Sequence, residues 1–201
     1  GKLLIPGLID DQVHFREPGL THKGEIATES KAAIAGGVTS YFEMPNVNPN
    51  TSTIENLEKK FDIAANKSYA NYSFYLGATN DNIEEIKKSD PNASCGLKVF
   101  MGASTGDLLV DKYESLEKIF EHCPTNIVTH CEDPKRLIEN ENIFQEKYGD
   151  QLHAAHHAVI RDEECCYLSS SLAVGLAKKF GANLHVLHLS TKREMDLFEP
   201  G

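Results

Sequence analysis

Strand-like and helix-like patterns alternate along the whole of this chain, and that alternation limits its fold more than any other feature. Short runs of β-branched and apolar residues are each followed by a segment whose apolar side chains recur at helical spacing. Strands separated by helices in this way pair in parallel through right-handed crossovers. We expect strands over residues 5–14, 38–44, 71–76, 96–101, 126–130 and 184–189, and helices over 24–35, 54–64, 82–88, 113–120, 134–147 and 158–180, with a last helix from about residue 191.

Six such repeats favour a (β/α)8 barrel, the TIM-barrel fold, over an open dinucleotide-binding sheet. None of the expected strands leads into the Gly-x-Gly-x-x-Gly turn that such a sheet uses. A complete eight-unit barrel needs about 250 residues, whereas this chain has 201. We therefore expect residues 1–201 to form one partial α/β barrel domain that covers about the first six βα units. The start inside a strand, without an initiator methionine, indicates a piece of a longer protein.

Two local features refine this expectation near the beginning of the chain. The apolar run over residues 3–9 is typical of a buried strand. Ser52 and Glu55 have the spacing of a capping box, which would begin the second helix.

Composition and charge exclude several classes of partner and location. The net charge is −10, from 20 basic and 30 acidic residues, which disfavours nucleic acid or an anionic membrane surface as a partner. No apolar run approaches the roughly 20 residues that a membrane-spanning helix needs. The five cysteines form no Cys-x-x-Cys pair. We therefore expect no disulfide framework and a reducing, cytoplasmic location.

Polar side chains collect where the first expected strand ends. Gln12, His14 and Arg16 alternate along this strand and are therefore expected on one face. An imidazole, an amide and a guanidinium together suit a metal ion and an anionic ligand rather than a packed core. A histidine at position 12 would complete a His-x-His metal clip, and this chain has Gln12 there instead.

The later strand ends also carry strong ligand types or hydrogen-bonding groups: Asn46, Lys98, His130 and His188. The carboxyl ends of the strands form one rim in a barrel of this kind, so these residues are expected to meet there. Lys98 is flanked by apolar residues, where an unpaired ammonium is costly, so it must lose its charge, find a partner or be modified.

Three other histidines are not expected to bind the metal, and the sequence predicts only where they lie. His185 is expected on the opposite face of its strand from His188, toward the helices. One of the adjacent residues His156 and His157 is expected to lie in a loop near the site, and neither is expected to bind a metal.

The order of these motifs resembles a known family. Residues 11–19 (Asp-Gln-Val-His-Phe-Arg-Glu-Pro-Gly), followed by Met-Pro-Asn at 44–46, are similar to dihydroorotases of the amidohydrolase superfamily. The match continues through Lys-Val-Phe-Met at 98–101, Thr-His-Cys-Glu at 129–132 and Leu-His-Leu-Ser-Thr at 187–191. The resemblance covers essentially the whole chain.

The resemblance implies a (β/α)8 barrel that holds one or two zinc ions. It places Gln12 and His14 at the His-x-His clip, and Lys98 at a lysine that carbon dioxide carboxylates so that it bridges two metals. His130 and His188 take the positions of the two ligands of the second metal. Arg16 and Asn46 match the residues that bind the carboxylate of the substrate, dihydroorotate or N-carbamoyl-aspartate, in pyrimidine (UMP) biosynthesis.

The implied reaction is metal-assisted, reversible hydrolysis of a cyclic amide, in which an aspartate moves a proton to the leaving nitrogen. That aspartate lies in an Asp-His-Ala-Pro-His motif, which this chain lacks. No acid/base residue is therefore identified here. We expect the 201-residue piece alone to be inactive, and the metal site with Gln12 to be weaker than the site with His130 and His188.

Two alternatives remain open at this point. One is an allantoinase or a hydantoinase-like cyclic amidohydrolase, against which Arg16 argues because the ring ureides carry no carboxylate there. The other is a degenerate, non-catalytic relative of dihydroorotase, which Gln12 favours and the retained site residues disfavour. The metal's identity and the oligomeric state are open as well, with a homodimer as one option.

Overall fold

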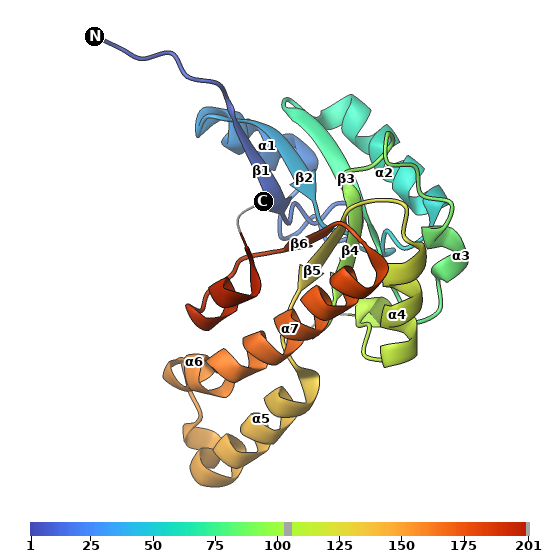
Figure 1. The fold of residues 1–201 in the computed structure, drawn as a ribbon. Coiled ribbons are helices and arrows are strands. Elements are labelled where there is room, and N and C mark those ends of the chain that lie inside the picture. Colours follow the sequence, from blue (N-terminus) through green and yellow to red (C-terminus); the bar gives the residue numbers. More distant parts are fainter. Residues whose placement is uncertain (103–105, 200–201) are drawn as a thin grey trace.

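The computed structural model describes residues 1–102 and 106–199, and it confirms a parallel α/β half-barrel (Figure 1). Six strands form one sheet in the order in which they occur along the chain, and every neighbouring pair is parallel. The strands are β1 (Leu8–Val13), β2 (Val38–Glu43), β3 (Asn71–Gly77), β4 (Gly96–Phe100), β5 (Ile127–His130) and β6 (Leu184–Val186).

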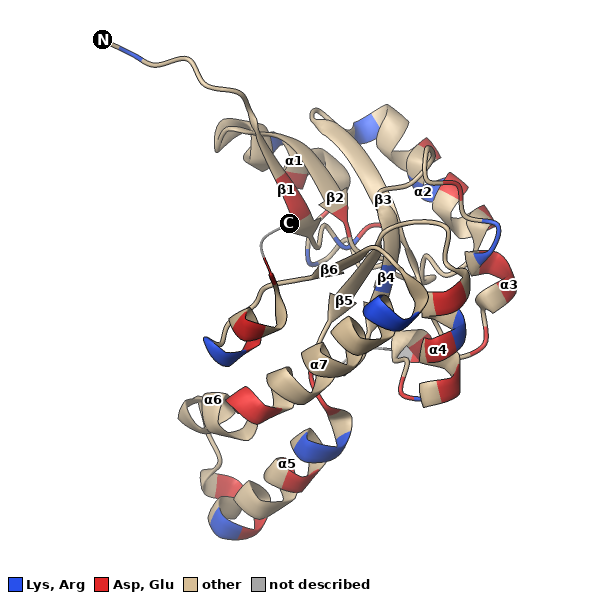
Figure 2. Cartoon of the chain, in the orientation of Figure 1, with Lys and Arg blue, Asp and Glu red and all other residues tan. Residues whose placement is uncertain are grey.

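Helices connect each strand to the next, as the alternating pattern predicts. The α-helices are α1 (Ile26–Ala35), α2 (Ile54–Lys67), α3 (Ile83–Ile86), α4 (Tyr113–His122), α5 (Pro134–Tyr148), α6 (His157–Ile160) and α7 (Glu163–Phe180). Short 3-10 helices cover Gly106–Leu108, Gly149–Gln151, Ala154–His156 and Arg193–Leu197. Charged residues of both signs lie along the longer helices α2, α4, α5 and α7 (Figure 2). No helix in the described part of the chain is long and apolar enough to cross a membrane.

Two predicted helices differ from the observed ones. The helix expected over 158–180 is divided, because Asp162 caps the N-terminus of α7 by accepting from the backbone N–H of Cys165. The last expected helix is the 3-10 helix Arg193–Leu197.

The predicted capping box at Ser52 is wrong as well. Thr53 is the N-cap of α2, where its Oγ1 accepts from the backbone N–H of Asn56 at 3.1 Å.

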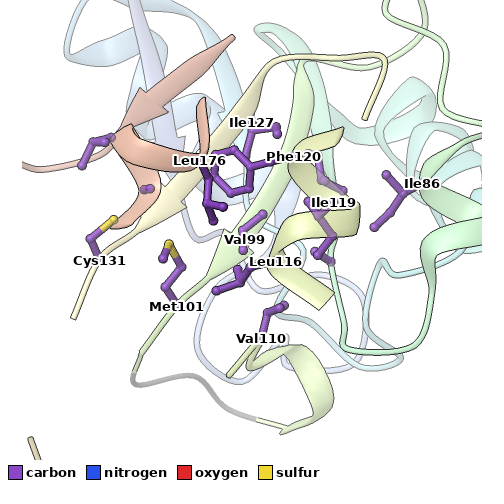
Figure 3. Close-up of a cluster of buried hydrophobic side chains, with 14 of the residues drawn as sticks. Ile86, Val99, Met101, Val110, Leu116, Ile119, Phe120, Ile127, Cys131 and Leu176 are labelled. Carbon is purple, nitrogen blue, oxygen red and sulfur yellow. The ribbon is translucent and has the colours of Figure 1, made fainter. Parts of the chain in front are cut away.

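The sheet has apolar residues on both faces. Leu97 and Val99 of β4 point toward the helices and belong to a large buried cluster that includes Phe120 of α4 and Leu176 of α7 (Figure 3). A smaller cluster fills the opposite, inner face with Met44, Tyr75, Val128 and Leu187. Because side chains alternate along a strand, Lys98 lies on this inner face, opposite Val128 in the register of β4 and β5.

The prediction of a buried strand over residues 3–9 is wrong. Strand β1 begins only at Leu8, and Leu8 and Ile9 remain 57% and 64% exposed. The physical reason is that β1 lies at one edge of the six-stranded sheet, so only β2 pairs with it within the described residues. The N-terminal segment runs away from the sheet in Figure 1.

Candidate metal and carboxylate site

The ends of β1 and β2 bring His14, Arg16 and Asn46 together. The Nδ1 atom of His14 lies 3.0 Å from Oδ1 of Asn46, and Nη1 of Arg16 donates to the Asn46 carbonyl at 3.5 Å. An amide oxygen can only accept, so Nδ1 of His14 carries the proton and Nε2 keeps its lone pair. Burial, together with the charge of Arg16, lowers the pKa of His14 to about 4. His14 is therefore neutral at pH 7, as a metal ligand must be.

Arg16 reaches this site by a route that strand alternation does not predict. Strand β1 ends at Val13, and Arg16 has a left-handed backbone with φ of 68°. Its N–H donates to Oε1 of Glu43 at 3.1 Å. The expectation that Gln12, His14 and Arg16 share one face through alternation is thus wrong for Arg16. Gln12 lies within β1 and is half-buried.

The ends of β5 and β6 bring His130 and His188 together. The Nδ1 atom of His130 lies 3.1 Å from Nε2 of His188. Two nitrogen ligands of a tetrahedral zinc ion would be separated by about 3.3 Å, given Zn–N distances of about 2.0–2.1 Å. Burial, together with the charges of His130 and Lys98, lowers the pKa of His188 and favours its neutral form. The pair therefore has the spacing that two nitrogen ligands of one metal ion require.

His185 does not face the helices, contrary to the prediction. Its Nε2 lies 3.3 Å from Oδ2 of Asp11 on β1, while Val186 packs in the cluster beneath the helices. His188 follows β6 with a positive φ of 38°. This turn interrupts the alternation, so His185 and His188 both reach the inner side of the sheet.

Lys98 occupies the inner face between these two groups. Its side chain is 1% exposed, and within the described residues its Nζ has no hydrogen-bond partner. Burial lowers the pKa of Lys98 to about 7. Its charge contributes to the lowered pKa of both His14 and His188. The neutral form of this buried amine is a nucleophile toward carbon dioxide, and the product would be an anionic oxygen ligand.

A carboxylate that sequence reasoning gave no role supports His130. Oε2 of Glu132 lies 2.7 Å from Nε2 of His130, and Nη1 of Arg161 donates to both Glu132 oxygens at 3.0 and 2.8 Å. Although burial raises the pKa of Glu132, the hydrogen bond from His130 and the charge of Arg161 lower it below its usual value. Two signals were available for Glu132: its position two residues after a strand-end histidine and its place in the Thr-His-Cys-Glu run at 129–132.

A cavity of about 260 Å³ opens beside this group. His130, Glu132, Arg161 and His188 line it, and so does His157. Its neighbour His156 instead stacks on Tyr148, with ring centroids 4.2 Å apart. His157 is therefore the histidine of this pair that lies near the site, but it begins α6 and does not lie in a loop as expected.

Comparison with known proteins identifies the family. The model of the family described as "Dihydro-orotase-like" matches residues 1–194. The chain belongs to the dihydroorotase-like family.

The relatives that match this chain include both dihydroorotases and allantoinases. The chain is 33% identical over 200 residues to an allantoinase of Streptomyces avermitilis, covering 97% of this chain and 44% of that protein. It is 31% identical over 200 residues to a dihydroorotase of Methanosphaera stadtmanae, covering 98% and 44%. The L-hydantoinase structure from Arthrobacter aurescens matches with a TM-score of 0.89 and 26% identity, covering 96% and 43%. The chain thus spans less than half the length of these relatives.

The donor set of this family member fits a metal centre only with Lys98 included. Within residues 1–102 and 106–199, no group of three or more His, Cys, Asp or Glu side chains could hold an ion. Lys98 is buried on the same inner face, and its Nζ has no hydrogen-bond partner among residues 1–102 and 106–199. Carboxylation would turn it from a repelled cation into a ligand, so the residues present fit a carboxylated-lysine centre.

Proposed function

We propose that this chain is the metal- and substrate-binding part of a dihydroorotase. The reaction is the reversible hydrolysis of the cyclic amide of dihydroorotate to N-carbamoyl-aspartate, a step of pyrimidine biosynthesis. One observation carries the proposal: Arg16 and Asn46 meet beside His14. A guanidinium and an amide next to a candidate metal ligand suit a ring that carries a carboxylate.

The residues that would hold the metal form two groups joined by Lys98. His14 and Gln12 would bind one zinc ion, His130 and His188 would bind a second, and carboxylated Lys98 would bridge them. When bound, the metal polarises the ring carbonyl and activates water.

The other residues bind and orient the substrate. Oδ1 of Asn46 is already engaged by His14, so its Nδ2 is the group free to donate to a substrate carboxylate. The guanidinium of Arg16 would take the same carboxylate in a bidentate contact. Glu132 is tied to His130 and Arg161 and therefore serves position rather than proton transfer.

Assays of the complete protein decide between dihydroorotase and the related cyclic amidohydrolases. We expect turnover of dihydroorotate and little turnover of allantoin or dihydrouracil. Arg16→Met should raise KM for dihydroorotate by about 100-fold, since a charged hydrogen-bonded contact contributes roughly 1.5–3 kcal/mol, and should leave the metal content unchanged. Faster turnover of allantoin or dihydrouracil by the wild type would contradict the proposal.

A non-catalytic relative is the second candidate, and Gln12 is the observation that favours it. Metal-loaded complete protein without turnover of any of the three substrates would support that candidate.

We also expect the purified 201-residue chain to be inactive by itself, and measurable turnover by it would refute this. The proposed location is the cytoplasm, where the five free cysteines would stay reduced.

A further inference from the structure

A buried ion pair lies directly behind the carboxylate-binding residues. Glu43 ends β2 and contacts Lys60 of α2, with side chains that are 1% and 0% exposed. Neither residue contributes to the metal or substrate contacts described above. The burial of Lys60 is the more unusual of the two, because a lysine in the second turn of an amphipathic helix normally extends into water.

Each partner of this pair also holds one of the two loops that carry the substrate-binding side chains. Oε1 of Glu43 accepts the N–H of Arg16 at 3.1 Å, at the residue with the left-handed backbone. Nζ of Lys60 donates to the carbonyl of Met44 at 2.9 Å, two residues before Asn46. A single pair of charges therefore fixes the backbone on both sides of the contact between Arg16 and Asn46.

Burying this ion pair carries a large desolvation cost, so it is an inefficient way to stabilise a fold. Burial raises the pKa of Glu43 and lowers the pKa of Lys60, so each charge is disfavoured by loss of water before its partner compensates. Apolar residues of similar volume often replace buried ion pairs with no loss of stability, or with a gain. A role in fixing the backbone at Arg16 and Met44 would explain why two charged residues are buried here.

We propose that Glu43 and Lys60 are positioning residues that preorganise Arg16 and Asn46 to bind the carboxylate of the substrate. This inference rests on the proposed dihydroorotase function. It predicts that removing the charges of Glu43 and Lys60 weakens substrate binding without lowering the stability of the fold. A purely structural pair would lower both together.

Two double variants of the complete protein separate the contributions. In Glu43→Met/Lys60→Met both backbone contacts are lost without leaving an unpaired charge. In Glu43→Gln/Lys60→Met the amide oxygen can still accept from Arg16. We expect KM for dihydroorotate to rise by about tenfold or more in the first variant and by less in the second. The metal content and the urea midpoint should stay at or above those of the wild type, and kcat should change less than KM.

The matched control is Glu55→Gln/Lys59→Met, which removes an exposed ion pair from the same helix. It should leave KM unchanged. Hydrogen exchange at the Arg16 amide gives a readout that needs no substrate. Exchange should accelerate in Glu43→Met/Lys60→Met and stay slower in the glutamine variant.

The outcomes distinguish this inference from the proposed function. A wild type that does not turn over dihydroorotate defeats the proposed function, while faster Arg16 exchange in the variant still supports positioning. An unchanged KM together with unchanged Arg16 exchange overturns the inference, even if the wild type is an active dihydroorotase. Failure of both double variants to fold also overturns it, because the pair would then stabilise the fold itself.

Discussion

Nε2 of His130 lies 2.7 Å from Oε2 of Glu132, which leaves Nδ1 of the same ring facing Nε2 of His188. An ionised carboxylate can only accept a hydrogen bond, so Nε2 of His130 carries the proton and Nδ1 keeps its lone pair. The carboxylate thus selects the tautomer that a metal ion on the inner side of the sheet would need. Carboxylates that orient metal-binding histidines in this way also increase the basicity of the ligand.

The first prediction concerns this carboxylate. Glu132→Gln should weaken zinc binding to the complete protein by about 10- to 100-fold, because the ring loses its charged acceptor and Arg161 its partner. Calorimetric titration with zinc measures the effect. The exposed Glu114→Gln on α4 is the control, and affinity equal to the wild type in Glu132→Gln would rule out the orienting role.

The second prediction concerns Lys98. Lys98→Met should abolish binding of the bridged metals, since no carboxylated side chain can form. It should also raise the free energy of unfolding of the metal-free protein by roughly 1–3 kcal/mol, because the change removes a buried amine that has no hydrogen-bond partner in the described part of the chain. Elemental analysis and urea unfolding test the two effects. Lys118→Met, at an exposed position, should change neither, and normal metal content in Lys98→Met would exclude Lys98 as a ligand.

The third prediction concerns Gln12. An amide oxygen is a weaker zinc donor than an imidazole, so the wild type should bind two zinc ions with unequal affinities. Gln12→His should strengthen the weaker site by about tenfold, or about 1.4 kcal/mol. Gln145→His adds an imidazole at an exposed position of α5 and serves as the control. Equal affinities at both sites of the wild type would contradict this prediction.

The fourth prediction concerns stability in acid. Asp162 caps α7 and pairs with Arg136, and the hydrogen bond from Arg136 holds the pKa of this carboxyl far below its usual value. A lowered folded-state pKa adds stability above the ordinary aspartate pKa of about 3.9, and this stability is lost as the pH falls further. Asp162→Asn keeps the cap and removes the charge. It should cost up to about 1 kcal/mol at pH 7.

Urea unfolding of the two proteins between pH 7 and pH 2 measures this difference. The gap between wild type and Asp162→Asn should shrink as the pH falls below about 4. The exposed Asp150→Asn should show little effect at either pH. A gap that stays constant down to pH 2 would show that the charge of Asp162 is not responsible.

Local pattern was sufficient to determine the class of fold and the rim on which the site lies. Apolar periodicity depends on neighbouring residues alone, and it predicted six strands and their helices close to their observed bounds. The same periodicity locates the strand ends, and therefore the polar residues that lie at or just beyond them. The placement of His14, Asn46, His130 and His188 at this rim therefore followed from sequence, as did that of Lys98 on the inner face of β4.

Only the tertiary structure decided where side chains point once a strand has ended. Arg16 and His188 have positive φ angles, and alternation has no meaning beyond such a turn. Because the turn at His188 breaks the alternation after β6, His188 lies on the same side of the sheet as His185, which contacts Asp11 instead of the helices. The contacts of Glu132 and the burial of Lys60 join segments that are distant along the chain. Periodicity cannot reveal them, because they depend on which helix packs against which strand.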